Sequence, residues 1–373
     1  MKPLSLSILL LLFCALPLAA QQVRVERLQG QLSHPWSLAF LPDDEGLLLT
    51  LRGGELRRWT AQGGLQPPIT GVPEVWAHGQ GGLLDVVLAP DFSSSRRVWL
   101  SFAEVGEEGK AGTAVGYGRL SDDYSSLNDF KVVFRQQPKL STGNHFGGRM
   151  AFDNQGHLFI ALGENNQRND AQRLARLQGK IVRLDSEGAV PVNNPWVNKP
   201  GVRPEIWSYG VRNPQGMALN PWSGQIWINE HGPRGGDEIN IPMAGKNYGW
   251  PIASWGIDYS GVRYPETQGG EVKGMEAPLW YWKVSPAVSG MAFYDEQRWP
   301  QWRHHVFIGA LKEKALLMLK LDGNRVVSEQ RLLEDRGQRI RDVRIGPDGD
   351  LYVLTDEAQG ELLRVSPQAE PAG

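Results

Sequence analysis

The chain has 373 residues and a formal net charge of -2 at pH 7, so it lacks the basic excess that attracts nucleic acid. It also carries 44 Gly, 25 Pro and 14 Trp, a composition typical of many turns and many aromatic strand residues. We therefore expect an all-β protein with no nucleic-acid partner.

The N-terminal residues 1–20 have the pattern of an export signal. Lys2 supplies a positive charge, and Leu4 to Leu18 is apolar but too short to cross a bilayer. We predict a signal peptide at 1–20, a mature chain at 21–373 and a periplasmic or secreted location. The single cysteine, Cys14, lies within this signal, so we expect no disulfide in the mature chain. No later apolar run has the length of a membrane span.

One pattern recurs six times along the chain. It consists of an apolar segment, a turn built on Asp, Asn, Gly or Pro, and a second apolar segment, which predicts a β-hairpin. The first segments of the six copies are 36–43, 84–91, 149–154, 216–221, 289–294 and 342–348. The second segments are 47–51, 98–102, 157–162, 225–229, 305–309 and 351–355. Candidate third strands follow in four copies, at 55–59, 180–184, 316–321 and 361–365.

Strand repeats of about 50–70 residues predict a β-propeller, in which each blade packs only on its neighbours. Six copies predict six four-stranded antiparallel blades in a single domain over 21–373. A β-sandwich with accidental similarity is the alternative, and the regular order of strands and turns disfavours it. Uneven spacing predicts long loops, where binding sites usually lie, at about 104–147, 185–211 and 240–285.

A short helix is predicted at 170–178. Its pattern places Leu174 and Leu177 on one face, and Gly179 is suited to end it. We expect this segment to be a short turn of helix between two blades.

A polar residue stands near the start of the first strand in most copies. Equivalent positions in a propeller surround one axis, so these residues are predicted to converge on one pocket. They are His34, Gln80, His145, Arg212 with Asn213, and Arg339 with Arg341, and Lys312 follows the second strand of the fifth copy. Such cations and amides suit an anionic, oxygen-rich ligand. For each residue alone, a packing or surface role is the alternative.

Oxygen ligands gather in the fourth copy. Asp237, Glu238, Tyr248 and the carbonyls of Gly232 and Pro233 would suit calcium, whereas zinc prefers thiolate and imidazole. An ordinary acidic turn is the alternative. The chain has no GxGxxG fingerprint, no Walker loop and no GxSxG elbow, so we expect no Rossmann cofactor.

Eight motifs in order carry a family resemblance. They are HGQGGLLDV (78–86), HFGGRMAFD (145–153), ALGENNQR (161–168), WSYGVRNPQGMA (207–218), NEHGPRGGDEIN (229–240), NYGWP (247–251), GALKEKAL (309–316) and RIRDVRIGPDGDLYVLTDE (339–357). Over about residues 30–365 the chain resembles the glucose/sorbosone dehydrogenase family. It resembles the soluble quinoprotein glucose dehydrogenases, and more closely the bacterial aldose sugar dehydrogenases.

The resemblance implies a six-bladed propeller that binds pyrroloquinoline quinone (PQQ) on its axis, together with calcium. The implied cofactor contacts are Gln80, Arg212, Asn213, Tyr259, Lys312, Arg339 and Arg341. The resemblance also implies that the carbonyls of Gly232 and Pro233 hold the cofactor calcium. A second calcium would lie at Glu238 and Tyr248, with Asp237 as a further candidate.

The implied reaction oxidises the anomeric hydroxyl of an aldose to the aldonolactone by hydride transfer to PQQ, which an external acceptor reoxidises. His145 takes the position of the family's catalytic base. Glu164 stands where the glucose enzymes have an aspartate that orients this histidine. Arg212, with Lys312 and calcium, would stabilise developing negative charge. Shorter loops than in the glucose enzymes favour broad sugar specificity and a monomer or weak dimer.

Two other functions remain open at this point. One is a calcium-dependent propeller sugar lactonase, and the other is a propeller that binds a partner without catalysis. The lactonase would not need the cations Lys312, Arg339 and Arg341.

Overall fold

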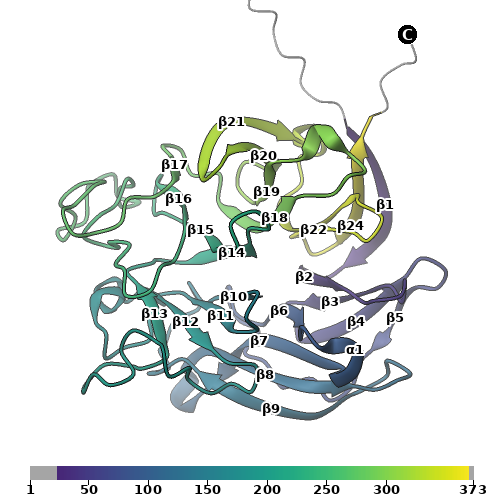
Figure 1. Cartoon of the computed structure of the whole chain (residues 1–373), viewed down its shortest axis with the longest axis horizontal. Helices are drawn as coiled ribbons and strands as arrows, with labels where there is room; N and C mark the ends of the chain where they lie inside the picture. Colours follow the sequence, from purple (N-terminus) through teal and green to yellow (C-terminus); the bar gives the residue numbers. More distant parts are fainter. Residues whose placement is uncertain (1–22, 369–373) are drawn as a thin grey trace, which may run out of the picture.

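The computed structural model describes residues 23–368, and the predicted signal peptide at 1–20 lies outside them. Residues 23–368 form six four-stranded antiparallel sheets arranged as the blades of a propeller (Figure 1). The all-β, six-bladed prediction is therefore confirmed. No helix in this range is both long enough and apolar enough to cross a bilayer.

The strands run in chain order from the axis outward in the first five blades. Blade 1 contains β2 (Pro35–Phe40), β3 (Leu47–Leu51), β4 (Glu55–Thr60) and β5 (Gly64–Pro68). Blade 2 contains β6 (Leu83–Leu88), β7 (Arg97–Val105), β8 (Ala111–Leu120) and β9 (Leu127–Arg135). Blade 3 contains β10 (Gly147–Phe152), β11 (Leu158–Leu162), β12 (Lys180–Leu184) and β13 (Ile206–Tyr209).

The remaining blades follow the same plan. Blade 4 contains β14 (Pro214–Leu219), β15 (Ile226–Glu230), β16 (Asp237–Asn240) and β17 (Trp280–Trp282). Blade 5 contains β18 (Val288–Tyr294), β19 (His305–Ala310), β20 (Ala315–Asp322) and β21 (Arg325–Leu332). Blade 6 contains β22 (Ile340–Ile345), β23 (Leu351–Thr355), β24 (Gly360–Pro367) and β1 (Val23–Leu32).

Helical segments within the described residues are short. They are α1 (Phe92–Ser95) and the 3-10 helices η1 (Glu107–Gly109), η2 (Arg168–Gln172), η3 (Pro300–Trp302) and η4 (Glu334–Arg336).

The N-terminal strand closes the ring. β1 is the outer strand of blade 6 and pairs antiparallel with β24, with Val25 opposite Val365. Figure 1 shows the purple β1 lying beside the yellow β24. Strands from opposite ends of the described chain therefore complete one blade.

The core lies between the blades. The second strands β3, β11, β15, β19 and β23 are buried along their whole length. A strand covered on both faces reads as a continuous apolar run instead of an alternating one, which explains segments such as LFIAL at 158–162. Between blades 4 and 5, for example, Trp227 packs edge-on against Phe293 with ring centroids 5.3 Å apart.

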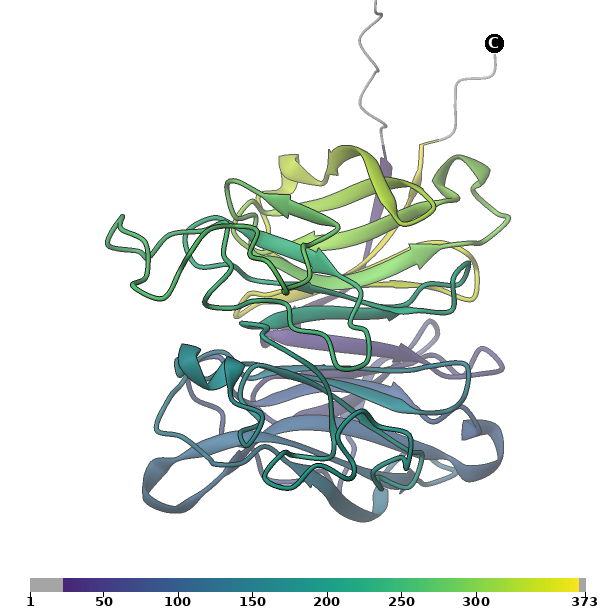
Figure 2. The ribbon, with the colours of Figure 1, turned by 60° about the vertical axis from the view of Figure 1, so that its left-hand side comes forward.

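Two expectations about the connections need correction. The predicted loop at 104–147 contains β8 and β9, the outer strands of blade 2. Gly112, Gly116 and Gly118 interrupt the apolar pattern of β8 and hide it in the sequence, although the strand pairs fully with β7. The other two predicted loops contain only the short strands β13 and β17, and Figure 2 shows the connection between β16 and β17 extending beyond blade 4.

The helix predicted at 170–178 is also wrong for most of its length, because only η2 at 168–172 is helical. The ammonium of the buried Lys180 donates to the carbonyls of Asp170, Ala171 and Gln178 at 2.9, 3.0 and 2.6 Å. Lys180 thus holds carbonyls at both ends of this segment, and the chain between 172 and 180 does not continue the helix.

Candidate active site

A pocket lies where the inner strands of all six blades begin. Because every blade contributes to its lining, it lies on the propeller axis. Its lining residues are Trp36, Arg52, Gln80, Phe146, Gly147, Asn213, Gln215, His231, Ala287, Leu311, Arg339, Arg341 and Asp356. The structure thus brings Gln80, Asn213, Arg339 and Arg341 together, as the repeat pattern predicted.

Asp356 fixes the two arginines of this axial pocket. Its Oδ2 lies 2.6 Å from Nη2 of Arg341 and 3.6 Å from Nη2 of Arg339. Its Oδ1 lies 3.0 Å from Nδ1 of His34. Burial acts to raise the pKa of Asp356, but Arg341, His34 and Arg339 together hold it well below its usual range. The pocket therefore carries a carboxylate that orients its cations.

A histidine–carboxylate pair adjoins the axial pocket. Nδ1 of His145 lies 2.5 Å from Oε1 of Glu164, and the backbone N–H of His145 donates to Oε1 of Gln80 at 2.8 Å. The longer side chain of Glu164 thus reaches the histidine. Burial and the nearby Arg212 lower the pKa of His145 below 6.5, although Glu164 opposes this shift. With Nδ1–H donated to Glu164, the neutral ring keeps its lone pair on Nε2 and can accept a proton there.

Arg212 connects the histidine pair to the loop after β15. Its Nη1 donates to the carbonyls of Gly232 at 2.9 Å and His231 at 3.2 Å. Its own carbonyl accepts from the backbone N–H of Glu164 at 2.9 Å. Its guanidinium carbon lies 5.3 Å from the ring centroid of Trp250. Arg212 therefore adds a fixed positive charge beside His145.

Two glutamates form a buried acidic pair next to Arg212. Glu230 and Glu238 face each other across β15 and β16, and the side-chain amide of Asn240 donates to both, at 3.4 and 3.2 Å. Burial raises the pKa of Glu230 to about 7. Burial and the neighbouring Glu230 raise the pKa of Glu238 well above its ordinary value. Two buried carboxylates this close together repel each other, so the pair is stable only when it is protonated or when a cation compensates its charge.

A second, small pocket next to this acidic pair brings together most of the predicted calcium ligands. Arg212, Glu230, Gly232, Glu238 and Tyr248 all line it. The hydroxyl of Tyr248 bonds to the backbone of Ile241 and Met243. Across residues 23–368, no site gathers three or more His, Cys, Asp or Glu side chains that could hold a metal. A cation here would therefore need neutral oxygens in addition to the two carboxylates.

Three predicted residues lie elsewhere or have other partners. Tyr259 is 70% exposed in the loop beyond β16, outside the lining of the axial pocket. Lys312 is exposed, and its neighbour Leu311 lines the pocket. Asp237 is buried and accepts from Ser285, Gly232 and Val288, so it anchors the loop after β15 to blade 5.

The donors in these pockets fit an anionic cofactor. The buried Nε atoms of Arg212 and Arg341 have no hydrogen-bond partner in the part of the chain that the structure describes. Buried donors are normally paired, so these two atoms are available for an acceptor that a ligand could supply. A flat tricarboxylate quinone such as PQQ supplies oxygen acceptors of the kind that guanidinium groups bind.

Asp356 and Glu230 were missed by the sequence reasoning. Both lie within two residues of the end of a second strand, and so does Glu164. The repeated polar residues of the sequence stand near the start of the first strand of each copy, not at the end of the second strand. A parallel search at the end of the second strand would have found all three carboxylates.

The fold and the axial site define a family. The model of the Glucose / Sorbosone dehydrogenase family matches residues 32–364, and the chain belongs to this family. It is 66% identical over 360 residues to the aldose sugar dehydrogenase YliI of Escherichia coli strain K12, covering 96% of this chain and 97% of that protein.

Solved structures agree with this assignment. The crystal structure of the soluble aldose sugar dehydrogenase of Escherichia coli in its apo-form has 67% identity and a TM-score of 0.92, covering 93% of this chain and 100% of that one. The PQQ-bound form of the aldose sugar dehydrogenase from Streptomyces coelicolor has 28% identity and a TM-score of 0.75, covering 93% and 99%.

Proposed function

We propose that this protein is a PQQ-dependent aldose sugar dehydrogenase, which oxidises the anomeric hydroxyl of an aldose to the aldonolactone. Family membership and the similarity to a PQQ-bound aldose sugar dehydrogenase support the proposal. The observation that carries it is the pair of His145 and Glu164 beside a pocket with buried, unpaired arginine donors. This arrangement joins a proton acceptor to a binding site for an anionic cofactor.

His145 is the general base in this proposal. Glu164 holds its Nδ1–H, so Nε2 is free to take the proton of the anomeric hydroxyl. The lowered pKa keeps the imidazole neutral near pH 7, as a base must be before the reaction. PQQ, when bound, supplies an orthoquinone that accepts the hydride from the anomeric carbon and passes the electrons to an external acceptor.

The cationic residues hold the cofactor. Arg339 and Arg341 would bind its carboxylates, and Gln80 and Asn213, which line the same pocket, would supply amide contacts. Arg212 places positive charge close to His145, where it would stabilise negative charge that develops in the reaction. Lys312 and Tyr259 are exposed in the free protein, and we propose that both turn toward the cofactor when it binds.

We propose two calcium positions. At the first, the carbonyls of Gly232 and Pro233 would hold the calcium. The Gly232 carbonyl also accepts a hydrogen bond from Nη1 of Arg212. At the second, Glu238 and Tyr248 bind calcium, and Glu230 adds a second carboxylate. The raised pKa values of the two glutamates support the second position, because a divalent cation would remove the repulsion between their ionised forms.

The proposal is tested by titrating the apo-protein with PQQ, with and without Ca²⁺, and recording the absorption spectrum. Aldoses are then added, and reduction of a dye is followed. We expect saturable binding and sugar-dependent reduction. His145→Ala should retain PQQ binding and lose about 100-fold or more in kcat.

A matched control is His157→Ala. Its Nδ1 also pairs with a carboxylate, 3.1 Å from Asp153, but in the turn between β10 and β11. This variant should turn over like the wild type. Failure to reduce dye with every aldose and metal condition would reject the proposal. Lactone hydrolysis without PQQ would favour the lactonase instead.

We further propose that the protein acts in the periplasm or as a secreted protein, as a monomer or weak dimer. The predicted signal at 1–20 supports the location. The test is fractionation of expressing cells, together with the N-terminal sequence and the molecular mass of the purified protein. An intact N-terminus in the cytoplasmic fraction would contradict it.

A further inference from the structure

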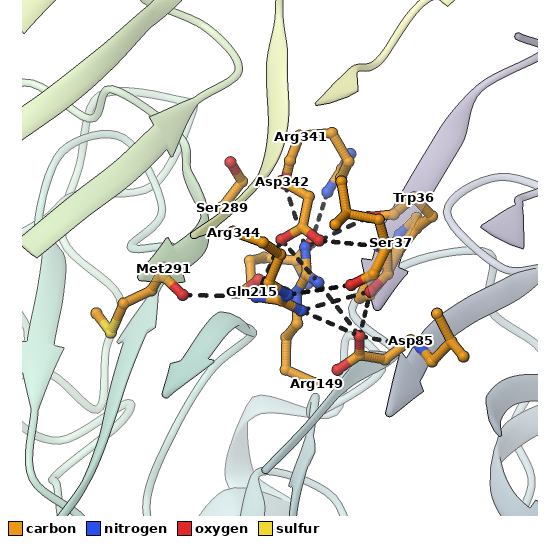
Figure 3. Close-up of polar contacts among 12 residues, drawn as sticks. Trp36, Ser37, Asp85, Arg149, Gln215, Ser289, Met291, Arg341, Asp342 and Arg344 are labelled. Carbon is orange, nitrogen blue, oxygen red and sulfur yellow. Dashed lines mark hydrogen bonds and ion pairs between the residues drawn. The ribbon is translucent and has the colours of Figure 1, made fainter. Parts of the chain in front are cut away.

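The inner strands arrange their side chains in three layers along the axis. The axial pocket is the first layer. The third is an apolar funnel at the opposite mouth, lined by residues such as Leu38, Val86, Met150, Met217 and Met291. Between them lies a polar layer, which we call the floor, made of Ser37, Asp85, Arg149, Ser289, Asp342 and Arg344 (Figure 3).

The floor satisfies the free backbone edges of the inner strands. Each inner strand has a hydrogen-bonded neighbour on one side only, so its other edge presents backbone groups to the axis. These groups need partners because they are buried. Oδ2 of Asp342 accepts from the N–H of Leu38 at 3.2 Å, and Oδ2 of Asp85 accepts from the N–H of Met150 at 2.8 Å. The carboxylates thus bind edge N–H groups of neighbouring blades.

Arg149 binds the edge carbonyls. Its Nε donates to the carbonyl of Gln215 at 2.7 Å. Its Nη2 donates to the carbonyls of Arg341 at 3.2 Å and Trp36 at 3.4 Å. All three acceptors belong to residues that line the axial pocket, on blades 4, 6 and 1. One guanidinium from blade 3 therefore holds three other blades directly beneath the pocket.

The charges of the floor balance locally. Nη1 of Arg149 lies 3.0 Å from Asp342 and 3.4 Å from Asp85. Arg344 lies 3.3 and 3.4 Å from the same two carboxylates. The side chains of Arg149, Asp85 and Asp342 are fully buried. Two cations and two anions leave no net charge, so the role of Arg149 is geometric rather than a source of positive potential in the pocket.

We propose that Arg149 is a positioning residue for the cofactor. It fixes the main chain of Trp36, Gln215 and Arg341 and so sets the arrangement of the pocket that receives PQQ. Nη1 of Arg341 donates to Oε1 of Gln215 at 3.0 Å, so a shift of either backbone turns the arginine away from the cofactor. Arg149 itself lies below the pocket lining. The inference rests on the proposed function, since it concerns the same cofactor.

The test compares PQQ affinity with the stability of the apo-protein. Arg149→Lys keeps the positive charge, but a single ammonium cannot reach three carbonyls and two carboxylates at once. We expect the dissociation constant of PQQ, measured by titration in Ca²⁺, to rise about tenfold or more, as when residues that orient ligands are replaced. The melting temperature of the apo-protein should fall as well.

Arg344→Lys is the matched control. Arg344 belongs to the same ion cluster as Arg149. Its Nε, however, donates to the carbonyl of Leu38, a residue that lines the funnel, at 3.2 Å. This variant should also lower the melting temperature, yet its PQQ affinity should stay within about twofold of the wild type. The reason is that Arg344 donates to the carbonyls of Leu38 and Met291 and to none of the three carbonyls that Arg149 holds beneath the pocket. The separation between affinity and stability is what a merely structural role would not produce.

The results decide whether Arg149 positions the cofactor site or only stabilises the fold. Wild-type PQQ affinity in Arg149→Lys, or equal losses of affinity in both variants, would overturn the inference. If Arg149→Lys does not fold, Arg149→Met combined with Asp85→Asn removes one cation and one anion and gives the same comparison. Absence of PQQ binding by the wild type would instead reject the proposed function itself, and the inference with it.

Discussion

Arg341 and Asp356 form a buried ion pair, with 2.6 Å between Nη2 and Oδ2, at the edge of the axial pocket. The carboxylate comes from the end of β23 and the guanidinium from β22, so the pair is fixed by two neighbouring strands of one blade. It leaves Nε of Arg341 without a partner among residues 23–368. The protein thus fixes one edge of this guanidinium through an ion pair within blade 6.

Asp356→Asn should lower the free energy of unfolding of the apo-protein by about 3 kcal/mol, because it leaves a buried cation without its anion. PQQ should then raise the melting temperature of the variant by more than that of the wild type, since a cofactor carboxylate replaces the lost charge. Thermal melts with and without PQQ measure both effects. Asp322→Asn, which breaks an exposed pair with Arg325, is the control and should change stability little. An unchanged PQQ shift would contradict the prediction.

The pH dependence of turnover should report His145. Burial and Arg212 lower the pKa of His145, so the imidazole becomes protonated only at a pH below 6.5. The acid limb of kcat/KM should therefore lie below pH 6.5. Glu164→Gln removes an anion that raises this pKa, so the limb should move to still lower pH while the maximal rate falls about 100-fold. Rate profiles of the PQQ-saturated protein measure both. An acid limb above pH 7 would rule out this assignment of the base.

The acidic pair should make the stability of the metal-free protein fall with rising pH. In the folded state Glu230 keeps its proton up to about pH 7, whereas an unfolded glutamate loses it near pH 4.5. The stabilising contribution is therefore complete below about pH 4.5 and is lost as pH rises through 7, a change on the order of 3 kcal/mol. Melting temperatures between about pH 5 and pH 8 test this.

Calcium should reverse that trend. Because it binds the ionised carboxylates, its stabilisation should be small near pH 5 and largest near pH 8. Glu230→Gln should flatten both dependences. Glu276→Gln, which removes the partner of the half-exposed Lys246, should leave them unchanged. A calcium shift that does not vary with pH would argue against metal binding at Glu230 and Glu238.

Gly290 provides space for the floor. A Cβ atom at this position would lie 2.0 Å from Oδ1 of Asp342, so Gly290→Ala should destabilise the protein by about 1–3 kcal/mol through overpacking. A Cβ at Gly53 would meet nothing within 4 Å, and Gly53→Ala should be near neutral. Denaturant unfolding of the two variants measures the difference. Equal stabilities would show that Asp342 moves freely.

The fold was largely predictable because its signal repeats. The predicted segments at 47–51 and 351–355 coincide with β3 and β23. Such strands are buried on both faces, so they are mostly apolar and end abruptly. β8 was missed because packing, not composition, specifies it: Gly116 stands where Phe130 and the Lys131 carbonyl leave no room for a side chain.

The site residues that lie in the family's motifs could be predicted from the sequence. The contacts that these residues make with other side chains and with carbonyls of the folded chain could not. Repeat position places Gln80, Asn213, Arg339 and Arg341 around one axis. It cannot show that Lys180 holds the carbonyls after β11, since that contact requires the folded chain. The pairing of Glu230 with Glu238 likewise follows from the register of β15 and β16, which the sequence leaves open.

The pairing of β1 with β24 has a consequence for folding order. Blades 1 to 5 are each built from strands that follow one another in the chain. Blade 6 instead joins β1, the first strand of the described chain, to β22, β23 and β24, its last three strands. Such a long-range contact is formed slowly, because the entropy of closing the intervening chain is lost before the contact stabilises it. The axial pocket uses Trp36 of blade 1 and Arg341 of blade 6, so it is complete only when these two blades meet. We therefore expect PQQ to bind a ring that has already closed, so PQQ present during refolding should leave the refolding rate of the protein unchanged.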